Sequence, residues 1–303
     1  MKPPPFEYFA AESLEEALEV LAVHGDEAKA LAGGQSLIPL LNFRLARPTV
    51  IVDLNRIHAI GRLTPLPSGG IAVGAMARQR DAERSSLISA RAPLVTAAMP
   101  YVAHPQIRNR GTFGGSIAHA DPAAELPAVA LALDAKFCAQ SRERKDRWID
   151  AADFFVGPLT TVLQADELLT EVELPPLPSG AGWAFVEVAR RHGDYALLGV
   201  AAVVALNAAG ECSHVRLTFV NAGGTPMRGR SAEQLLLGQR PDEEAFRAAG
   251  EAAAMTDIDP TGDVHATPAY RRQLARVLTV RALEDAFQVA VVALARAGAT
   301  AGV

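Results

Sequence analysis

Two short stretches of the chain combine paired glycines with small hydroxyl residues. They are residues 32–36 (AGGQS) and residues 112–116 (TFGGS). A glycine has no Cβ and tolerates a positive φ, so the backbone can turn sharply and bring its N–H groups against an anion. The hydroxyls add donors, and a helix after the first stretch would turn its N-terminus toward the same anion. Together, the two stretches could hold one large anionic ligand.

Neither stretch matches the two commonest nucleotide fingerprints. The first lacks the lysine of a P-loop, and neither has the G-x-G-x-x-G spacing of a Rossmann turn. Each glycine pair taken alone is also typical of an ordinary tight turn. The occurrence of both pairs with matching flanks favours the ligand interpretation.

The first stretch lies in a predicted β-α-β unit. Ser13 and Glu16 form a capping box, and the apolar spacing that follows predicts a helix over 14–24, ended by Gly25. Residues 29–32 read as a strand that leads into the first stretch. The β-branched run at 49–54 (TVIVDL) predicts a buried strand, which completes the unit at about residue 55.

The second stretch lies in a predicted second unit. A strand at 71–74 is followed by helical patterns over 78–104, punctuated by prolines. After the second stretch we expect an alanine-rich helix at 121–133, begun by Pro122. The remaining expected elements are strands at 136–139 and 147–149, a helix at 151–155 and a strand at 167–174.

A linker, PPLPSGAG at 175–182, precedes a third region. We expect antiparallel strands at 183–190, 196–207 and 213–221, and then helices at 231–237, 242–255 and 268–297, the last capped by Thr267. The expected fold class is therefore α+β. It comprises a two-part N-terminal α/β domain (1–177, subdomains about 1–55 and 56–177), a C-terminal domain with an antiparallel sheet and helices (178–290) and a tail (291–303).

The composition is that of a globular protein with no affinity for polyanions. The chain has 303 residues, 50% of them hydrophobic, and a formal net charge of -5, so neither nucleic acid nor an anionic membrane attracts it. No apolar run reaches a membrane span, and we expect a soluble cytoplasmic protein. The only cysteines are Cys138 and Cys212, so the chain cannot hold an iron–sulfur cluster by itself. The histidine spacing suggests no metal site.

No residue set in the sequence forms a self-sufficient catalytic apparatus, so any redox chemistry must come from a cofactor. Motifs in six segments resemble the FAD-binding (medium) subunit of molybdenum hydroxylases, the family of carbon monoxide dehydrogenase, nicotine and caffeine dehydrogenases and the flavin domain of xanthine dehydrogenase. The motifs follow the family's order over nearly the whole chain. They are MKPPPFEY at the start, AGGQSLIPLLNFRLARP (32–48), VDLNRI (52–57), IAVGAMARQRD (71–81), HPQIRNRGTFGGSIAHADPAAELP (104–127) and RRHGDYALLGVAA (190–202).

The resemblance implies a non-Rossmann, vanillyl-alcohol-oxidase-like FAD-binding domain with FAD held non-covalently. It places the pyrophosphate on Ala32, Gly33, Gly34, Gln35 and Ser36 and on Thr112, Phe113, Gly114, Gly115 and Ser116. Ala30, Leu31 and Leu37 extend the first contact. Val102 and Ala103 match positions near the flavin, and Leu168 and Leu169 match a contact to the ring system, although a core strand would use the same residues. Tyr195 matches an aromatic residue that covers the isoalloxazine and controls access to it, a surface-turn tyrosine being the alternative.

Two acids and a histidine follow the second stretch. By resemblance, Glu125 takes the place of a carboxylate that binds the adenosine part of FAD. Asp121 is expected to cap the following helix and to share one face with Glu125 at i and i+4. Both could instead be first-turn acids favoured by the helix dipole. His119 is either a backbone contact of the cofactor or a structural histidine, and Arg190 and Asp194 are expected to pair across their loop.

The resemblance predicts an FAD-carrying electron-transfer subunit of a heterotrimeric molybdenum hydroxylase. A large subunit would hold molybdopterin and a small subunit two [2Fe-2S] clusters, with a dimer of heterotrimers as the assembly. The substrate and the final electron acceptor stay open. A self-contained FAD-dependent oxidase or reductase is the alternative, and a non-catalytic nucleotide-binding subunit is a third possibility.

Overall fold

The computed structural model describes residues 2–301, and its N-terminal part is a small parallel sheet. The strand order is β1 (Glu7–Ala10), β3 (Val50–Asp53), β2 (Ala28–Leu31), and both pairings are parallel. The helical elements of this part are α1 (Leu14–His24), η1 (Gly25–Glu27), α2 (Leu37–Asn42) and η2 (His58–Gly61). The predicted β-α-β unit is therefore present, with β1 as an additional strand.

Helix α1 begins at the predicted cap. The Ser13 hydroxyl accepts a hydrogen bond from the backbone N–H of Glu16 at 3.2 Å. The Glu16 carboxylate in turn accepts from the N–H of Glu12, one residue before the cap, at 2.9 Å. The Ser13 bond of the capping box is thus made as predicted, whereas the return bond of Glu16 goes to the N–H of Glu12 instead of that of Ser13.

The central part is a five-stranded sheet, antiparallel throughout. Its strand order is β4 (Leu63–Pro65), β5 (Ile71–Gly74), β10 (Leu168–Leu174), β6 (Lys136–Gln140), β7 (Arg147–Asp150). A two-stranded ribbon, β8 (Phe155–Gly157) with β9 (Thr160–Thr161), lies beside it. The helices are α3 (Gln79–Arg84), α4 (Ser86–Arg91), α5 (Pro93–Ala98), α6 (Pro105–Arg108), α7 (Phe113–His119), α8 (Glu125–Ala132) and α9 (Ala151–Phe154).

Two predictions in this part are wrong. The second glycine stretch does not form a sharp turn with N–H groups free for an anion: its glycines lie in the first turn of α7, which Thr112 caps through a bond from the N–H of Gly115 to its hydroxyl. The predicted helix at 121–133 starts only at Glu125. Because the Asp121 carboxylate accepts from the N–H of Ala123 at 2.9 Å, it forms a local turn that competes with the helix, and Ala124 at the cap position is extended.

The C-terminal part contains a second antiparallel sheet in the order β11 (Gly182–Ala189), β12 (Ala196–Leu206), β13 (Cys212–Val220), β14 (Met227–Arg228). Its helices are α10 (Arg230–Leu236), α11 (Glu243–Ala252), the π-turn η3 (Ala253–Asp257) and α12 (Pro268–Ala301). Thr267 caps α12 by accepting from the N–H of Tyr270, as predicted. The expected tail is helical up to Ala301, and residues 302–303 lie outside the described part.

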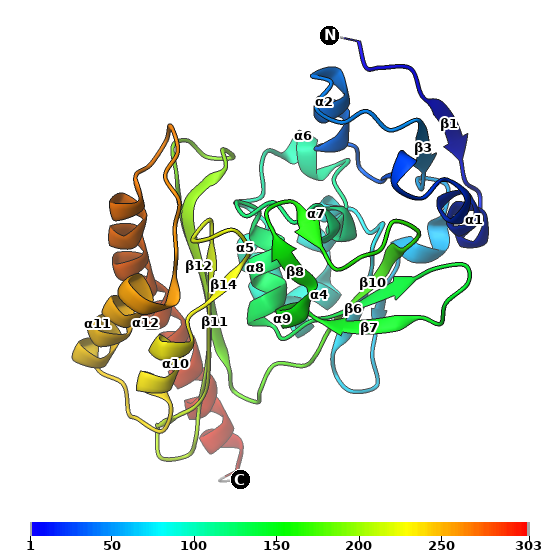
Figure 1. Cartoon of the computed structure of the whole chain (residues 1–303). Helices are drawn as coiled ribbons and strands as arrows, with labels where there is room; N and C mark the ends of the chain where they lie inside the picture. The colour runs from blue at the N-terminus through cyan, green and yellow to red at the C-terminus, as the bar shows by residue number, and fades with distance from the viewer. Residues whose placement is uncertain (1, 302–303) are drawn as a thin grey trace.

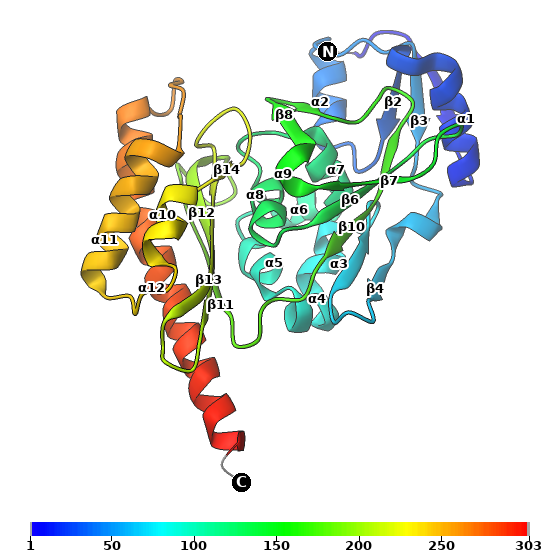
Figure 2. The same cartoon turned by 60° about the horizontal axis from the view of Figure 1, so that its bottom comes forward.

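The molecule is layered, and one core spans the junction between its parts. Helices α10, α11 and α12 lie on one side of the sheet β11–β14, and α5 and α8 lie between that sheet and the central one (Figures 1 and 2). The junction core mixes side chains of both sheets, for example Phe137 and Val172 with Phe185 and Val203. The expected α+β fold class is confirmed. No helix among residues 2–301 has the length and apolar composition to cross a bilayer.

Candidate functional site

The first glycine stretch forms the rim of a cavity of about 430 Å³. Leu31, Ala32, Gly33, Gly34 and Gln35 line it, together with Ile38, Pro39, Asp53, Asn55, Ile107 and Arg110. Of the other residues predicted here, Ala30 packs against the core of the N-terminal sheet, and Ser36 precedes Leu37, the first residue of α2. Gly34 has a φ of +75°, a conformation that favours glycine.

The backbone of this stretch is unpaired on its donor side. Among the described residues, no protein group accepts a hydrogen bond from the N–H groups of residues 33–36. The Gln35 side chain donates to the carbonyl of Gly33 at 3.0 Å, which closes the turn without using any of these amides. Consecutive free amides at the rim of a cavity form an anion-binding concavity.

One cation and one carboxylate also line the cavity. Arg110 is exposed, and its guanidinium forms no ion pair or hydrogen bond with the residues that the structure describes. Asp53 is already engaged, since its oxygens accept from the Tyr8 hydroxyl at 2.5 Å and from the N–H of Asn55 at 2.9 Å. Burial raises the pKa of Asp53, but these bonds and the charge of Arg110 outweigh it and keep the pKa below its usual value. The free charge at the cavity is therefore positive.

Arg78 joins the two glycine stretches. It donates to the carbonyl of Arg110 at 2.5 Å and to the side-chain oxygen of Asn55 at 2.7 Å. Asn55 in turn donates to the carbonyl of Ala32 at 2.9 Å. The stretches also lie against each other, because a Cβ on Gly115 would lie 3.6 Å from the Ala32 Cβ, and one on Gly33 would lie 2.4 Å from the carbonyl oxygen of Arg110, just before the second stretch. The prediction that the two stretches come together is thus met by geometry.

In the second stretch the N–H groups of residues 113–116 are all bonded within the protein, contrary to the prediction. The N–H groups of Phe113 and Gly114 donate to the carbonyls of Ala77 and Ala75 at 2.8 and 2.9 Å. Those of Gly115 and Ser116 donate to the hydroxyl and the carbonyl of Thr112. Ser116 is partly exposed, and its hydroxyl forms no hydrogen bond with the described residues.

Gly114 serves packing within the protein. A Cβ at this position would lie 2.4 Å from the Ala75 Cβ and 2.6 Å from its Cα, so the glycine allows α7 to approach the end of β5. The Cβ of a Gly115 variant would instead meet the Thr112 hydroxyl at 2.5 Å and break the helix cap. Both glycines are required by the fold, whatever ligand is bound.

The segment with Val102 and Ala103 lies at the junction of the two domains. Arg108, which is almost fully buried, donates to both of their carbonyls at 2.8 Å and forms an ion pair with Glu83 at 3.1 Å. Ala103 has a φ of +45°. This segment, predicted to lie near the flavin, is therefore held in a defined, locally strained shape.

Glu125 begins α8 and is 6% exposed. Burial raises its pKa to about 7, the nearby charge of Asp121 acts in the same direction, and that of Arg108 opposes it. Asp121 precedes the helix, so the predicted arrangement of both acids on one helix face is wrong. Half-buried His119 ends α7, and burial lowers its pKa. A buried carboxyl without a partner side chain among the described residues is suited to a ligand hydroxyl.

Tyr195 lies on the turn between β11 and β12 and is 69% exposed. The protein around its phenol and the charges of Asp121 and Glu125 raise its pKa, which places the ring near the start of α8. Leu168 and Leu169 are both buried, in the N-terminal and the junction cores respectively.

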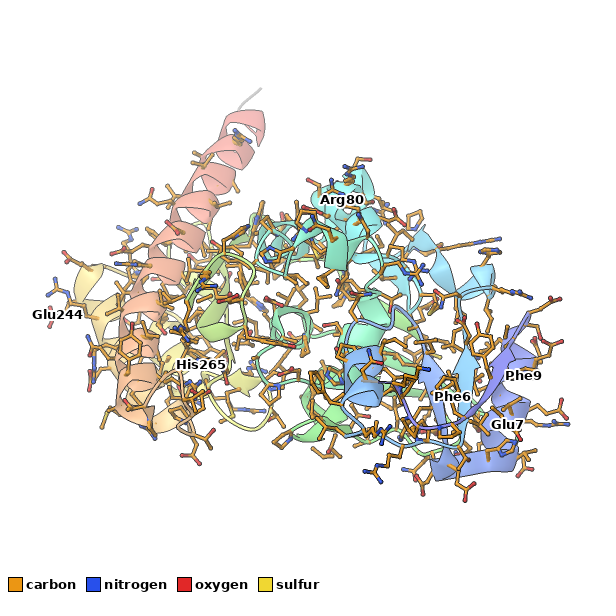
Figure 3. The ribbon with its side chains drawn as sticks, turned by 90° about the horizontal axis from the view of Figure 1, so that it is seen from above. Phe6, Glu7, Phe9, Arg80, Glu244 and His265 are labelled. Atoms are coloured by element: carbon orange, nitrogen blue, oxygen red, sulfur yellow. The ribbon has the colours of Figure 1, made fainter. Side chains whose placement is uncertain are left out.

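The turn that carries Tyr195 contacts the other domain through Gly193, where a Cβ would lie 2.4 Å from the His104 ring. The predicted pair of Arg190 with Asp194 is absent from the described interactions, and Arg190 instead lies 3.2 Å from the ring nitrogen of His265. Figure 3 shows His265 at the end of the molecule opposite to Phe6 and Phe9. The turn is thus fixed from both sides.

Three residues of the site were missed by the analysis of the sequence. Asn55, Arg78 and Arg110 all lie within motifs that carried the resemblance. Only Arg110 is close in sequence to one of the two glycine pairs. Its charge two residues before Thr112 was the available signal. Residues 2–301 contain no cluster of His, Cys, Asp and Glu side chains that could hold a metal ion.

Comparison with known proteins places these observations in a family. Residues 4–177 match the FAD binding domain in molybdopterin dehydrogenase, and residues 183–286 match the CO dehydrogenase flavoprotein C-terminal domain. The 6-hydroxypseudooxynicotine dehydrogenase complex subunit alpha of Paenarthrobacter nicotinovorans is 45% identical over 94% of this chain and 96% of its own length. Caffeine dehydrogenase subunit beta of a Pseudomonas species is 40% identical over 94% of this chain and 96% of its own length.

The fold agrees with a solved relative. A chain of carbon monoxide dehydrogenase from Hydrogenophaga pseudoflava superposes with a TM-score of 0.92 at 37% identity, covering 95% of this chain and 99% of that one. Sequence and structure therefore agree over both domains. The chain belongs to the FAD-binding subunits of the molybdopterin dehydrogenase family, and is the flavoprotein (medium) subunit of an oxidoreductase of the molybdenum hydroxylase class.

Proposed function

We propose that this chain passes electrons from the [2Fe-2S] clusters of a small partner subunit to an external acceptor through non-covalently bound FAD. The observation that carries the proposal is the run of unpaired backbone N–H groups at residues 33–36, beside the cavity and the unpaired guanidinium of Arg110. Four amides and one cation match the charge and the acceptor oxygens of a pyrophosphate.

The second stretch contributes by position. Since the N–H groups of residues 113–116 are already bonded within the protein, we assign to this stretch the Ser116 hydroxyl and a rigid wall rather than these backbone donors. The adenosine hydroxyls are assigned to Glu125. We place the isoalloxazine at the junction of the two domains, between the segment of Val102 and Ala103 and the turn of Tyr195, which approach each other where Gly193 meets His104. When bound, FAD supplies the redox chemistry, and the chain's own residues bind it, orient it and limit solvent access to it.

The cysteine content agrees with a partner that carries the clusters. Two buried cysteines, Cys138 and Cys212, are fewer than the ligands that an iron–sulfur cluster needs. The relatives include a "dehydrogenase complex subunit" and a "medium chain". We therefore propose a heterotrimer with a large molybdopterin subunit and a small [2Fe-2S] subunit, assembled as a dimer of heterotrimers in the cytoplasm.

The test begins with the absorption spectrum of the purified full-length chain, before and after incubation with FAD. We expect a flavin spectrum with about one FAD per chain, released into the supernatant by acid precipitation. Co-expression with candidate partner subunits then tests assembly by light scattering. Turnover of an organic substrate by the chain alone would favour the self-contained oxidase or reductase, and absence of flavin in both the chain and the complex would refute the proposal.

A further inference from the structure

Glu187, on β11, faces the junction between the two domains. Side chains of a strand alternate between its faces, and Ala184, Val186 and Val188 belong to the core under the C-terminal helices, whereas Phe185 belongs to the junction core. Glu187 therefore lies on the same face as Phe185. The Phe185 ring packs against Tyr101, with ring centroids 5.2 Å apart, next to Val102 and Ala103.

Glu187 has a buried oxygen without a partner. Its Oε2 is shielded from solvent and forms no hydrogen bond with the described residues. An orphaned buried oxygen of this kind costs stability unless a ligand satisfies it. Its strand neighbour Gly199 pairs with Glu187 in register and has no side chain, so this neighbour offers the carboxyl no donor or acceptor.

Glu187 is close to residues already placed at the site. The charge of Glu125 raises the pKa of the Glu187 carboxyl and also that of the Tyr195 phenol. Glu125 is thus near enough to both Glu187 and Tyr195 for its charge to act on each of them. The β11 strand that carries Glu187 ends directly before the turn that carries Tyr195.

We propose that Glu187 is a further contact of the cofactor, which it reaches from the C-terminal domain with Oε2 as a hydrogen-bonding group opposite Glu125. The inference rests on the proposed FAD site and extends it to a residue outside the glycine stretches. Burial, reinforced by the charge of Glu125, raises the pKa of Glu187 to about 9. The carboxyl is therefore neutral at pH 7 and can donate a hydrogen bond to a cofactor oxygen or nitrogen.

The titratable and charged groups around Glu187 come from several elements. Glu125 on α8 is the charge that acts on Glu187 itself. Asp121 in the preceding turn and Arg108 on α6 act on Glu125, and the charges of Asp121 and Glu125 act on Tyr195. Their contributions to any pH profile are shared by the wild type and by a Glu187 variant, so the difference between the two profiles isolates Glu187.

The test compares Glu187→Gln, which keeps a neutral donor, with Glu187→Leu, which removes it, in FAD titrations of the flavin-free full-length chain. We expect Glu187→Gln to bind FAD like the wild type at pH 7 and Glu187→Leu to bind about tenfold more weakly, the loss of one buried hydrogen bond. Above about pH 9 the wild type should lose affinity relative to Glu187→Gln, because ionisation removes its donor.

A second measurement separates cofactor binding from folding. Without FAD, Glu187→Leu should have a raised midpoint of thermal unfolding because it removes an unsatisfied buried oxygen. The wild type holds a proton on Glu187 that the unfolded chain releases above its usual pKa of 4.5, so its stability should fall from about pH 4.5 to about pH 9 more steeply than that of Glu187→Gln.

Thr279→Val is the matched control, since the buried Thr279 hydroxyl is also unpartnered but lies on α12, away from the junction. It should raise stability and leave FAD affinity unchanged. Equal FAD affinity of Glu187→Leu and the wild type, with superimposable pH profiles for Glu187→Gln, would overturn the inference while the FAD site stands. If the wild-type chain takes up no FAD alone or with its partners, the proposed function itself fails.

Discussion

The two glycine stretches have nearly the same residue pattern and opposite uses of their backbone. In residues 33–36 the N–H groups have no acceptor among the described residues, whereas in residues 113–116 every N–H is bonded within the protein. The first stretch follows a strand and turns before a six-residue helix, and its residues 33–35 line the cavity. The second is pressed against β5. A glycine pair therefore indicates that another group comes close to the backbone. The neighbouring elements decide whether that group is a ligand, as proposed for the first stretch, or another part of the protein, as in the second.

The largest effect should come from Gly114→Ala. Its Cβ would meet Ala75 at 2.4 Å, and overpacking of this kind costs about 1–3 kcal/mol. The free energy of unfolding of the flavin-free chain, measured by urea titration, should fall by that amount. Gly157→Ala is the control, because its Cβ would meet nothing closer than 4.0 Å. Equal stability of the two variants would contradict the packing role of Gly114 and leave ligand binding as the reason for the second glycine pair.

Arg110→Gln should weaken FAD binding about tenfold, the loss of one charge-assisted contact to phosphate, with no change in the unfolding midpoint of the flavin-free chain. Fluorescence titration with FAD measures the effect, which should shrink as salt is added. Arg84→Gln removes the same charge at the exposed end of α3, outside the cavity, and should bind FAD normally. A similar loss in both variants would mean that only the net charge matters.

The two hydroxyls that precede the helices should respond differently. Thr112→Ala should destabilise the chain by about 1 kcal/mol because it removes a helix cap. Ser36 makes no capping bond, so Ser36→Ala should leave the stability unchanged and lower only the affinity for FAD. Paired denaturation and titration experiments on the two variants check this, and equal losses of stability would erase the distinction between the stretches.

The smallest effect on binding is expected for Tyr195→Ala, which lies outside both stretches. FAD should be retained with unchanged affinity, while the rate of flavin reoxidation by external acceptors should change because the exposed ring no longer covers the cofactor. Stopped-flow traces with several acceptors measure this. Identical kinetics with each acceptor would remove Tyr195 from the site.

Local patterns were sufficient wherever neighbouring residues decide the structure. Ser13 starts α1 and Thr267 starts α12 as predicted, because a cap bonds within its own first turn. The helix predicted at 121–133 failed since Asp121 prefers its own turn, which is also fastened across the domain junction by the bond from the N–H of Asn221 to the carbonyl of Pro122 at 2.7 Å. Local sequence patterns cannot predict this bond, because Asn221 is distant from Pro122 in the sequence.

The sequence by itself determined the family, the cofactor and the two places where the backbone carries no side chain. Motifs and glycines can be read from single segments of the chain. Only the tertiary structure decided which glycine pair keeps its amides free, since Ala75 and Ala77 reach the second pair from a distant strand end. It also brought Arg78, Asn55 and Arg110 together and placed Glu187 opposite Glu125. These groups lie far apart in the chain. Packing within the N-terminal domain brings Arg78, Asn55 and Arg110 together, and packing between the domains brings Glu187 near Glu125.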